Sequence, residues 1–455
     1  MVKHALSVDL GASGTKVFLS CIRHSDIELR EVGRFESFWY SRRGLTFWDV
    51  DKLYNEITDI IRRLEKTCRI QSIGFDGWGV DFVPLDENDR KLMDPMRYFS
   101  MFAEQEKIKE EIEKHKRFIN HCVPGQYQPF NTVYQLMYYK KMFPDLFAKI
   151  KKIVPIPCYL TGRLCGNYKY EFTHASTTQL YDFSKNEWNR DICEKFGFAD
   201  FLPEVVRSGT IIGKTSSGID CILPATHDTA SAYAAISGDL SDTLIISVGT
   251  WCLNGVITKK KELNNAFILK NNLAVEGCYD GSLRILSNTP GLVFWQKIKA
   301  ELETDEKRQI DYSELLQLSL KHRDFKKTID VDNASYLLST SILPTLQNDF
   351  QTENIGKILC GILNSLAYRI NQTRTILEQG LQMRIKRVHM IGGGIQNTLL
   401  CEKIAETLKM DVYAGPTEGT ALGNTIVQFL SEKTIQSPEE KSHLLEKASG
   451  MLKYT

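Results

Sequence analysis

The sequence lacks several features that mark whole classes of protein. None of its apolar runs is long enough to span a bilayer. Neither sign of charge is in excess, because 57 basic and 56 acidic residues leave a net charge of +1. We therefore do not expect a surface that binds nucleic acid or an anionic membrane. The N-terminal run Met1–Leu6 is short and soon meets Asp9, so we do not expect a signal peptide either.

Paired cysteine motifs are also missing. The 11 cysteines, an odd number, are scattered without a CxxC pair. In a chain of 455 residues this pattern indicates free, mostly buried thiols in a reducing cytoplasm, and it argues against a disulfide framework or a zinc site. The chain does contain 42% apolar residues, enough for well-packed cores, and its length suits two domains.

Two strand–turn–strand patterns lie about half the chain apart. Residues 6–19 (LSVDLGASGTKVFL) and 244–257 (LIISVGTWCLNGVI) each predict a strand, a glycine-containing turn and a second strand. Glycine allows backbone N–H groups to converge on a small anion, so each turn could hold phosphate. A glycine-rich hairpin is more often only a hairpin. The repeat nevertheless favours two related domains that face each other, with a nucleotide in the cleft between them.

Other glycines follow predicted strands. A strand at 386–391 ends in Gly392–Gly394, where a flat ring or a phosphate could approach the backbone. A strand at Ile70–Phe75 runs into Asp76–Phe82 (DGWGVDF), and loops in such positions often bind ligands in α/β proteins. Both stretches could equally be structural corners. The apolar spacing at 355–380 predicts a long helix.

Further on, a strand is expected at Arg284–Leu286 and a turn at Asn288–Gly291. From about Ser431 the chain is charged and polar, which predicts a surface tail.

His227 and Asp228 stand side by side in the stretch LPATHDTAS. Thr229 and the small residues Ala232–Ala235 predict a helix that begins here, so Asp228 could simply be a helix cap. A carboxylate at a helix N-terminus is also favoured in its ionised form, which suits a residue that must accept a proton. The residues of this stretch leave both interpretations open.

Nine motifs follow one another along the chain: DLGASGTK (9–16), TFWDVD (46–51), IGFDGWGVDFVPLD (73–86), QPFNTVYQL (128–136), YEFTHASTTQL (170–180), ATHDTASA (225–232), SVGTW (247–251), IGGGIQNTLL (391–400) and AGPTEGTALGN (414–424). In this order and spacing, they resemble the motifs of the FGGY carbohydrate kinases. That resemblance implies the two-domain, actin/hexokinase-like (ribonuclease H-like) α/β ATPase fold with an interdomain cleft. It extends from Val8 to about Leu430 and implies domains at 1–220 and 221–432, followed by a tail at 433–455.

The resemblance also implies roles for individual residues. Asp228 matches the general base that takes the proton of a sugar hydroxyl as it attacks the γ-phosphorus of ATP. Asp9 matches a carboxylate that helps to hold Mg²⁺. Asp76 and Asp81 receive no role. The implied ATP contacts are Ala12, Ser13, Gly14, Thr15, Lys16, Thr250, Gln296 and Gly393, and the implied sugar contacts are Gly79, His227, Asp228, Thr229 and Asn288.

Two of these contacts keep an ordinary alternative, since Gln296 could be an exposed helix residue and Asn288 a turn residue. The sugar-side loop also departs from the family members that the chain most resembles. They carry Tyr-Arg-Asp and a nearby Arg, where this sequence reads Arg97–Phe102 (RYFSMF), and Cys158 replaces an expected Asp.

We therefore expect a cytoplasmic kinase that uses ATP and Mg²⁺ and acts on a small-molecule sugar. The acceptor is a ketose, phosphorylated at a primary hydroxyl, or alternatively a polyol or a sugar acid. A non-catalytic sensor of sugar or nucleotide is the alternative from another class. Homodimers occur in such families, but nothing in the sequence specifies an interface.

Overall fold

The computed structural model describes residues 3–12, 14–23, 26–333, 335–339, 341–448 and 450–455. These residues form two compact units, each discontinuous in the sequence. Unit 1 comprises Met1–Gly238, Thr258–Arg284 and Gly419–Ala448, and unit 2 comprises Asp239–Ile257, Ile285–Glu418 and Ser449–Thr455. The domain boundary expected near residue 220 stays a prediction. No helix in the described part of the chain is long and apolar enough to cross a membrane.

Unit 1 is built on a sheet with the strand order β13-β14-β6-β1-β2-β3. Strand β1 lies inside this sheet, antiparallel to β2 and parallel to β6, which confirms the hairpin predicted at 6–19. The strands of unit 1 are β1 (His4–Leu10), β2 (Gly14–Arg23), β3 (Asp26–Glu36), β4 (Trp39–Arg42), β5 (Leu45–Trp48), β6 (Ile70–Gly77), β7 (Phe82–Leu85), β8 (Lys152–Pro155), β9 (Tyr170–Glu171), β10 (Tyr181–Asp182), β11 (Glu187–Trp188), β12 (Val205–Val206), β13 (Thr210–Lys214), β14 (Asp220–Leu223) and β17 (Ala274–Gly277).

The helices of unit 1 are α1 (Val50–Leu64), α2 (Tyr98–Glu104), α3 (Lys109–Cys122), α4 (Thr132–Met142), α5 (Pro144–Phe147), α6 (Ile156–Cys165), α7 (Phe172–Ala175), α8 (Arg190–Phe196), α9 (Asp228–Ala234), α10 (Asn265–Lys270), α17 (Gly419–Ser431) and α18 (Pro438–Ala448), with short 3₁₀ helices η1 (Gln105–Ile108) and η2 (Ala199–Phe201). Of these, α1 and α6 pack on one face of the sheet and α17 and α18 pack on the other.

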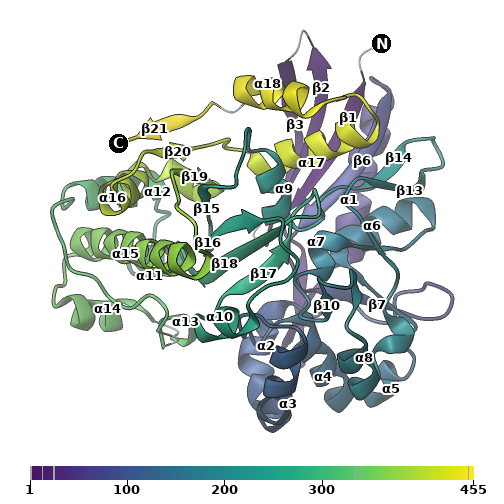
Figure 1. Cartoon of the computed structure of the whole chain (residues 1–455), viewed down its shortest axis with the longest axis horizontal. Coiled ribbons are helices and arrows are strands. Elements are labelled where there is room, and N and C mark those ends of the chain that lie inside the picture. Colours follow the sequence, from purple (N-terminus) through teal and green to yellow (C-terminus); the bar gives the residue numbers. More distant parts are fainter. Residues whose placement is uncertain (1–2, 13, 24–25, 334, 340, 449) are drawn as a thin grey trace. The chain divides into compact units, whose positions relative to one another are not determined.

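Successive side chains of β1 point to opposite faces of the sheet, so one strand contributes to the packing on both. Leu6 and Val8 pack into a core that includes residues of α1 and α6. Ser7, which points the other way, hydrogen-bonds Thr425 of α17 at 2.9 Å. Helices α17 and α18 lie beside β1 and β3 (Figure 1). Asp9 shares the alternation of Ser7, so the predicted metal ligand belongs to the face that α17 covers.

Helix α9 packs closely against α17. A Cβ atom added at Gly423 would lie 1.7 Å from the backbone oxygen of Ser231, so only glycine permits this approach. The start of α9, where Asp228 stands, is thereby fixed against the sheet of unit 1.

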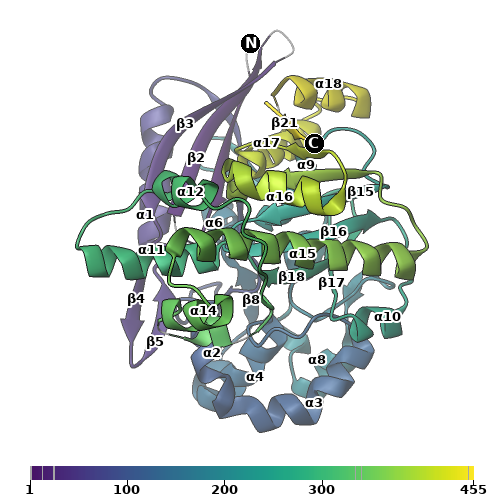
Figure 2. The same ribbon diagram turned by 90° about the vertical axis from the view of Figure 1, so that its left-hand side faces the viewer.

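Unit 2 contains a sheet in which β18, β16, β15, β19, β20 and β21 follow in this order. Strands β15 and β16 pair antiparallel, which confirms the hairpin predicted at 244–257. The predicted long helix is α15, which lies between α14 and α16 (Figure 2). The elements of unit 2 are β15 (Thr243–Val248), β16 (Trp251–Thr258), β18 (Leu283–Pro290), β19 (Arg387–Ile391), β20 (Val412–Ala414), β21 (Leu452–Tyr454), α11 (Val293–Glu306), α12 (Tyr312–Leu320), α13 (Ser335–Leu338), α14 (Leu343–Phe350), α15 (Ile355–Leu381), α16 (Thr398–Leu408) and the 3₁₀ helix η3 (Gly393–Gln396).

Two local predictions were wrong. The expected surface tail contains helix α18, because Leu444 and Leu445 are buried in a core with residues of α17 while the charged side chains of the helix lie outside it. The turn expected at Asn288–Gly291 is mostly strand, since β18 continues to Pro290.

Candidate active site

Asp228 is the first residue of α9 and is not its N-cap. The N-cap position belongs to His227, whose side chain makes no capping hydrogen bond. Oδ1 of Asp228 accepts hydrogen bonds from the backbone N–H of Thr229 at 2.5 Å and from its hydroxyl at 3.1 Å. The carboxylate is 33% exposed, and Oδ2 accepts no hydrogen bond from the described residues. A ligand hydroxyl can therefore approach Oδ2.

Burial sets the pKa of Asp228. The protein atoms packed around the carboxylate raise its pKa to about 6, although the two Thr229 donors and the Arg284 charge act in the opposite direction. The expectation that a helix start holds this group in an ordinary ionised state was therefore incomplete, because desolvation outweighs the local donors. With a pKa near 6, Asp228 is still ionised at neutral pH and is a stronger base than an ordinary aspartate.

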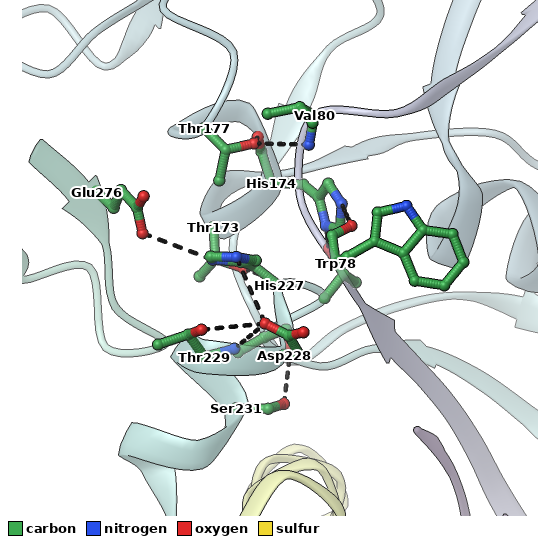
Figure 3. A network of polar contacts seen from close by, with 12 residues as sticks. Trp78, Val80, Thr173, His174, Thr177, His227, Asp228, Thr229, Ser231 and Glu276 are labelled. Atoms are coloured by element: carbon green, nitrogen blue, oxygen red, sulfur yellow. Dashed lines mark hydrogen bonds and ion pairs between the residues drawn. The ribbon is translucent and has the colours of Figure 1, made fainter. Parts of the chain in front are cut away.

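His227 lies between two acidic side chains. Its Nε2 is 3.5 Å from Oδ1 of Asp228, and its Nδ1 is 3.7 Å from Oε2 of Glu276. The same Nδ1 is 2.6 Å from Nη2 of Arg284, a fully buried side chain that also pairs with Glu276. Figure 3 shows His227 between Glu276 and Asp228. Burial, and then the Arg284 charge, hold the pKa of His227 well below its ordinary value, so the ring is neutral.

Glu171, at the end of β9, anchors the loop that leads to Asp228. Its buried Oε2 accepts from the backbone N–H and the hydroxyl of Thr226, at 3.1 and 2.8 Å. It also accepts from the N–H and hydroxyl of Thr173 at 2.9 and 2.6 Å. The Thr173 hydroxyl in turn accepts from the backbone N–H of His227 at 3.1 Å. One carboxylate thus ties α7 to the residues immediately before the candidate base.

The loop that follows β6 is strained and held in place. Val80 has φ of 70°, an unusual value for a β-branched residue. Its N–H donates to the Thr177 hydroxyl at 3.2 Å, and its carbonyl accepts from Thr132 at 2.8 Å. A Cβ atom at Gly79 would lie 3.1 Å from Thr177, so a larger residue would press against that side chain.

The same loop reaches the Asp228 region. Gly77 forms a parallel bridge with His227, and Nε2 of His174 lies 3.0 Å from the carbonyl oxygen of Trp78. Figure 3 shows Trp78 and Val80, the neighbours of Gly79, close to His174 and His227. The structure therefore brings together the predicted sugar contacts of unit 1.

Asp81 holds Trp78 of this loop and Trp48 of β5. Its Oδ2 accepts from Nε1 of Trp48 at 2.7 Å and from Nε1 of Trp78 at 3.0 Å, and the two rings lie 4.2 Å apart. Burial raises the pKa of Asp81 to about 6. The Arg97 guanidinium lies 4.4 Å from the ring centres of both Trp39 and Trp48. The stretch Arg97–Phe102, which was expected to be a loop, is the N-cap and first part of helix α2. It begins on an aromatic surface that Asp81 helps to hold in place.

The first glycine turn is tightly closed. The N–H of Gly11 donates to the carbonyl of Gly14 at 2.9 Å, and the N–H of Gly14 returns a bond to Gly11 at 3.2 Å. The predicted phosphate contacts Ala12, Gly14, Thr15 and Lys16 stay predictions, and Ser13 lies outside the described residues. In this turn the N–H of Gly14 is directed at the chain itself.

The donors around Asp9 fit Mg²⁺. Asp9 is paired in register with Asp76 of β6. Asp76 is fully buried, its Oδ2 accepts from Asn424 at 2.5 Å, and its Oδ1 has no partner among the described atoms. Burial and the Asp9 charge raise the pKa of Asp76 well above its ordinary value. The described residues include no cluster of three or more ligating side chains. Mg²⁺ commonly keeps several waters and needs only one or two carboxylates, so Asp9 suits it.

Three predicted ATP contacts lie together in unit 2. Nε2 of Gln296 donates to the Thr250 hydroxyl at 3.0 Å. A Cβ atom at Gly392 or Gly394 would collide with Val248, at 2.8 and 2.6 Å, which packs the glycine turn against the end of β15. The space around Gly393 is open, so a ligand can reach its backbone. The predicted sugar contact Asn288 is also in this unit, on β18.

Sequence reasoning missed the residues that surround the histidine and the aspartate. Glu276, Arg284 and Glu171 were not among the predicted site residues. A signal was present for Arg284, because it is a charged residue inside the apolar run Leu283–Leu286. Such a residue needs a buried partner, and Glu276 supplies it from the neighbouring stretch of chain.

Family models, curated proteins and solved structures all match this chain along nearly its full length. Residues 4–227 match the N-terminal domain and residues 244–432 match the C-terminal domain of the FGGY family of carbohydrate kinases. A Halalkalibacterium halodurans protein named rhamnulokinase is 33% identical, over 100% of this chain and 99% of its own. One of the same name from Oceanobacillus iheyensis is 31% identical, over 99% and 97%. The crystal structure of Plasmodium falciparum glycerol kinase with ADP has the same fold, with a TM-score of 0.79 at 17% identity, over 100% of this chain and 94% of that one.

Proposed function

The chain belongs to the FGGY family of carbohydrate kinases, and from that premise we propose that it transfers the γ-phosphate of ATP to the primary C1 hydroxyl of L-rhamnulose. Kinases of this family use ATP as the phosphoryl donor. The observation that carries the chemistry is Asp228, a partly exposed carboxylate with a pKa of about 6 and an open Oδ2. The full-length similarity to two proteins named rhamnulokinase supports the choice of sugar. An enzyme with this donor and 11 free cysteines suits the reducing cytoplasm, where we expect it to act.

In the proposed reaction, Oδ2 of Asp228 accepts the proton of the sugar hydroxyl as that oxygen attacks the γ-phosphorus. The bond from the γ-phosphorus to the β–γ bridging oxygen breaks, and ADP leaves. Removing the proton makes the oxygen a better nucleophile, and a base with a pKa near 6 remains available at neutral pH. His227, Thr229 and the backbone at Gly79 orient the sugar. Phosphoryl transfer depends mainly on positioning and charge neutralisation, so no covalent intermediate is needed.

The proposed ATP contacts are Ala12–Lys16, Thr250, Gln296 and Gly393, and Asn288 is a further proposed sugar contact. Asp9 would hold Mg²⁺, which would neutralise charge on the phosphates.

A coupled assay of ADP release tests the proposal. The purified protein is given Mg²⁺-ATP and, separately, L-rhamnulose, other ketoses, polyols and sugar acids. The highest kcat/KM is expected with L-rhamnulose. Turnover of another acceptor at a higher kcat/KM would keep the kinase chemistry and replace the sugar. Binding of ATP without turnover of any sugar would refute the kinase proposal for this chain.

Arg97 supports a second candidate acceptor, a sugar acid. Its guanidinium is stacked on Trp39 and Trp48, and its buried Nε has no acceptor among the described atoms. A guanidinium with unused donors suits a carboxylate, which accepts two parallel hydrogen bonds. The same panel of acceptors tests this candidate. A sugar acid should then have a higher kcat/KM than its neutral counterpart, and Arg97→Gln should remove that difference.

A further inference from the structure

Arg284 is an unusual residue to find in a strand interior. Its side chain is 0% exposed, and its only charged partner within reach among the described residues is Glu276, which accepts from Nε at 3.0 Å and from Nη2. Nη1 is buried without an acceptor in the described part of the chain. Replacing a buried ion pair by apolar residues is often neutral or stabilising. Stability alone therefore does not explain why an arginine stands here.

The contact with His227 supplies a chemical reason. Nη2 of Arg284 lies 2.6 Å from Nδ1 of His227. A guanidinium has only donors and does not lose its proton in proteins, so Nδ1 must be the acceptor. An imidazole that accepts at Nδ1 carries its proton on Nε2. Arg284 thus selects one of the two neutral tautomers of His227.

The proton on Nε2 of His227 points toward Asp228, the candidate base. Nε2 of His227 is 3.5 Å from Oδ1 of Asp228, beyond an ordinary hydrogen bond but close enough for both groups to contact one sugar. The donor on Nε2 would meet an oxygen of the sugar while Oδ2 of Asp228 takes a proton from the neighbouring hydroxyl. The opposite tautomer would present a lone pair there and would bind a different group.

We propose, on the basis of the kinase function above, that Arg284 and Glu276 are positioning residues that hold His227 as a neutral imidazole protonated on Nε2, so that it donates a hydrogen bond to the sugar oxygen next to the attacking hydroxyl. Glu276 has a separate part in this arrangement. It receives two donors of Arg284, and this fixes the guanidinium so that Nη2 faces His227.

Neutrality of His227 matters for the base. The charged or titratable groups that face the ring are Asp228, Glu276, Arg284 and His174. Without the arginine, two carboxylates would flank the ring and favour the imidazolium. An imidazolium 3.5 Å from Asp228 would stabilise the ionised carboxylate and weaken it as a base. The positive charge of Arg284 and its hydrogen bond prevent this.

Nitrogen NMR of the histidine side chains tests the tautomer directly. The chain has 9 histidines, so His227→Gln assigns the signal in ¹⁵N-histidine-labelled protein. In the unsubstituted protein we expect a neutral ring with the proton on Nε2 at neutral pH. In Arg284→Met we expect a proton on Nδ1, facing Glu276, and titration at higher pH. Arg284→Lys retains an obligate donor and should keep the proton on Nε2.

Steady-state kinetics with the best sugar substrate distinguishes a positioning role of Arg284 from a role in folding alone. Arg284→Met should lower kcat/KM for the sugar about tenfold to a hundredfold, as expected when a buried donor loses its orientation, with KM for ATP unchanged. Arg284→Lys should recover a substantial part of that loss. Arg163→Met is the matched control in the same unit: it removes an arginine that pairs with Asp51 and stacks 4.0 Å from Tyr54, and it should leave turnover unchanged.

The outcomes are distinguishable. If Arg284→Met lowers the melting temperature but leaves the His227 tautomer and the sugar kcat/KM unchanged, the arginine is only structural and the inference is wrong. An equal loss of the Nε2 proton in Arg284→Lys and Arg284→Met would also overturn it. If the unsubstituted protein turns over no sugar, the proposed function fails, while the NMR experiment still decides whether Arg284 sets the tautomer.

Discussion

Replacing Asp228 by Asn should stabilise the folded protein while it removes activity. Burial raises the pKa of Asp228 from 3.8 to about 6, so ionising this group is more difficult in the folded state. At about 1.4 kcal/mol per pKa unit, the ionised carboxylate costs at most about 3 kcal/mol at neutral pH. The side chain is 33% exposed, and solvent screening reduces this to roughly 1–2 kcal/mol. Asn has the same shape, keeps an oxygen for the Thr229 donors and carries no charge.

The difference between the two proteins should depend on pH in one direction. At low pH the carboxyl group is protonated in the folded and unfolded states alike, and the substitution has little effect. As pH rises from about 4 to about 6, the unfolded state releases the proton first, so the unsubstituted protein loses stability relative to Asp228→Asn. Above the folded-state pKa, near 6, the difference reaches its full value.

Urea denaturation between about pH 5 and pH 8 measures this difference, and the ADP-release assay measures turnover in parallel. Turnover should fall by about 10²–10⁴-fold, the usual contribution of a general base. Asp49→Asn is the matched control, because Asp49 caps α1 by accepting from the N–H of Lys52 at 2.9 Å. Asn caps as well as Asp, so this control should change neither quantity. A less stable Asp228→Asn protein with nearly full turnover would show that Asp228 is a structural residue and not the base.

Four further outcomes follow from the same geometry. The kcat/KM of the unsubstituted enzyme should fall below about pH 6 as Asp228 gains a proton, as a pH–rate profile will show. Asp9→Asn should raise the Mg²⁺ concentration needed for half-maximal turnover and weaken the stabilisation that Mg²⁺-ATP gives in thermal unfolding. Gly423→Ala should destabilise unit 1 by about 1–3 kcal/mol in urea, because the new methyl group meets the backbone of α9. Glu171→Ala should cost roughly 2–4 kcal/mol by leaving the buried Thr173 and Thr226 donors unpaired, whereas Glu171→Gln keeps an acceptor and should cost less.

Local patterns predicted most of the elements that support the site. Both glycine hairpins, the helix that begins at Asp228 and the long helix α15 were visible in the sequence, because each depends on a short apolar period and on residues that favour turns or helix starts. The failures have the same origin. The local sequence near the C-terminus is compatible both with a charged tail and with a helix that buries Leu444 and Leu445. The helix forms because these two side chains pack into a core with residues of α17. The strand at Asn288 likewise continues to Pro290 in a sheet with β16, and the N–H of Gly291 just after it donates to the carbonyl of Thr250 at 2.9 Å.

The roles of Asp76 and Asp81 also required the structure. Both carboxylates were visible at the end of a predicted strand, but their partners come from distant parts of the sequence: Asn424 for Asp76, and Trp48 for Asp81. In the folded protein, Asp81 fixes the aromatic loop, and Asp76 occupies the buried position beside Asp9. Sequence spacing marked this strand end as a candidate site, which stays a prediction. The separate roles of the two carboxylates depend on contacts that span 33 residues for Asp81 and 348 residues for Asp76.

The strength of the candidate base is another property that no short stretch determines. Packing raises the pKa of Asp228, the Thr229 donors and Arg284 lower it, and Glu276 raises it again. Thr229 is adjacent in the sequence, whereas Arg284 and Glu276 come from β18 and β17 and act on both His227 and Asp228. A sequence that kept the His-Asp pair but lost the arginine would still resemble a kinase motif. Without the arginine, its histidine would bind a second proton at higher pH, and a charged histidine would make the aspartate a weaker base. The His-Asp pair alone would therefore overstate the activity of that protein.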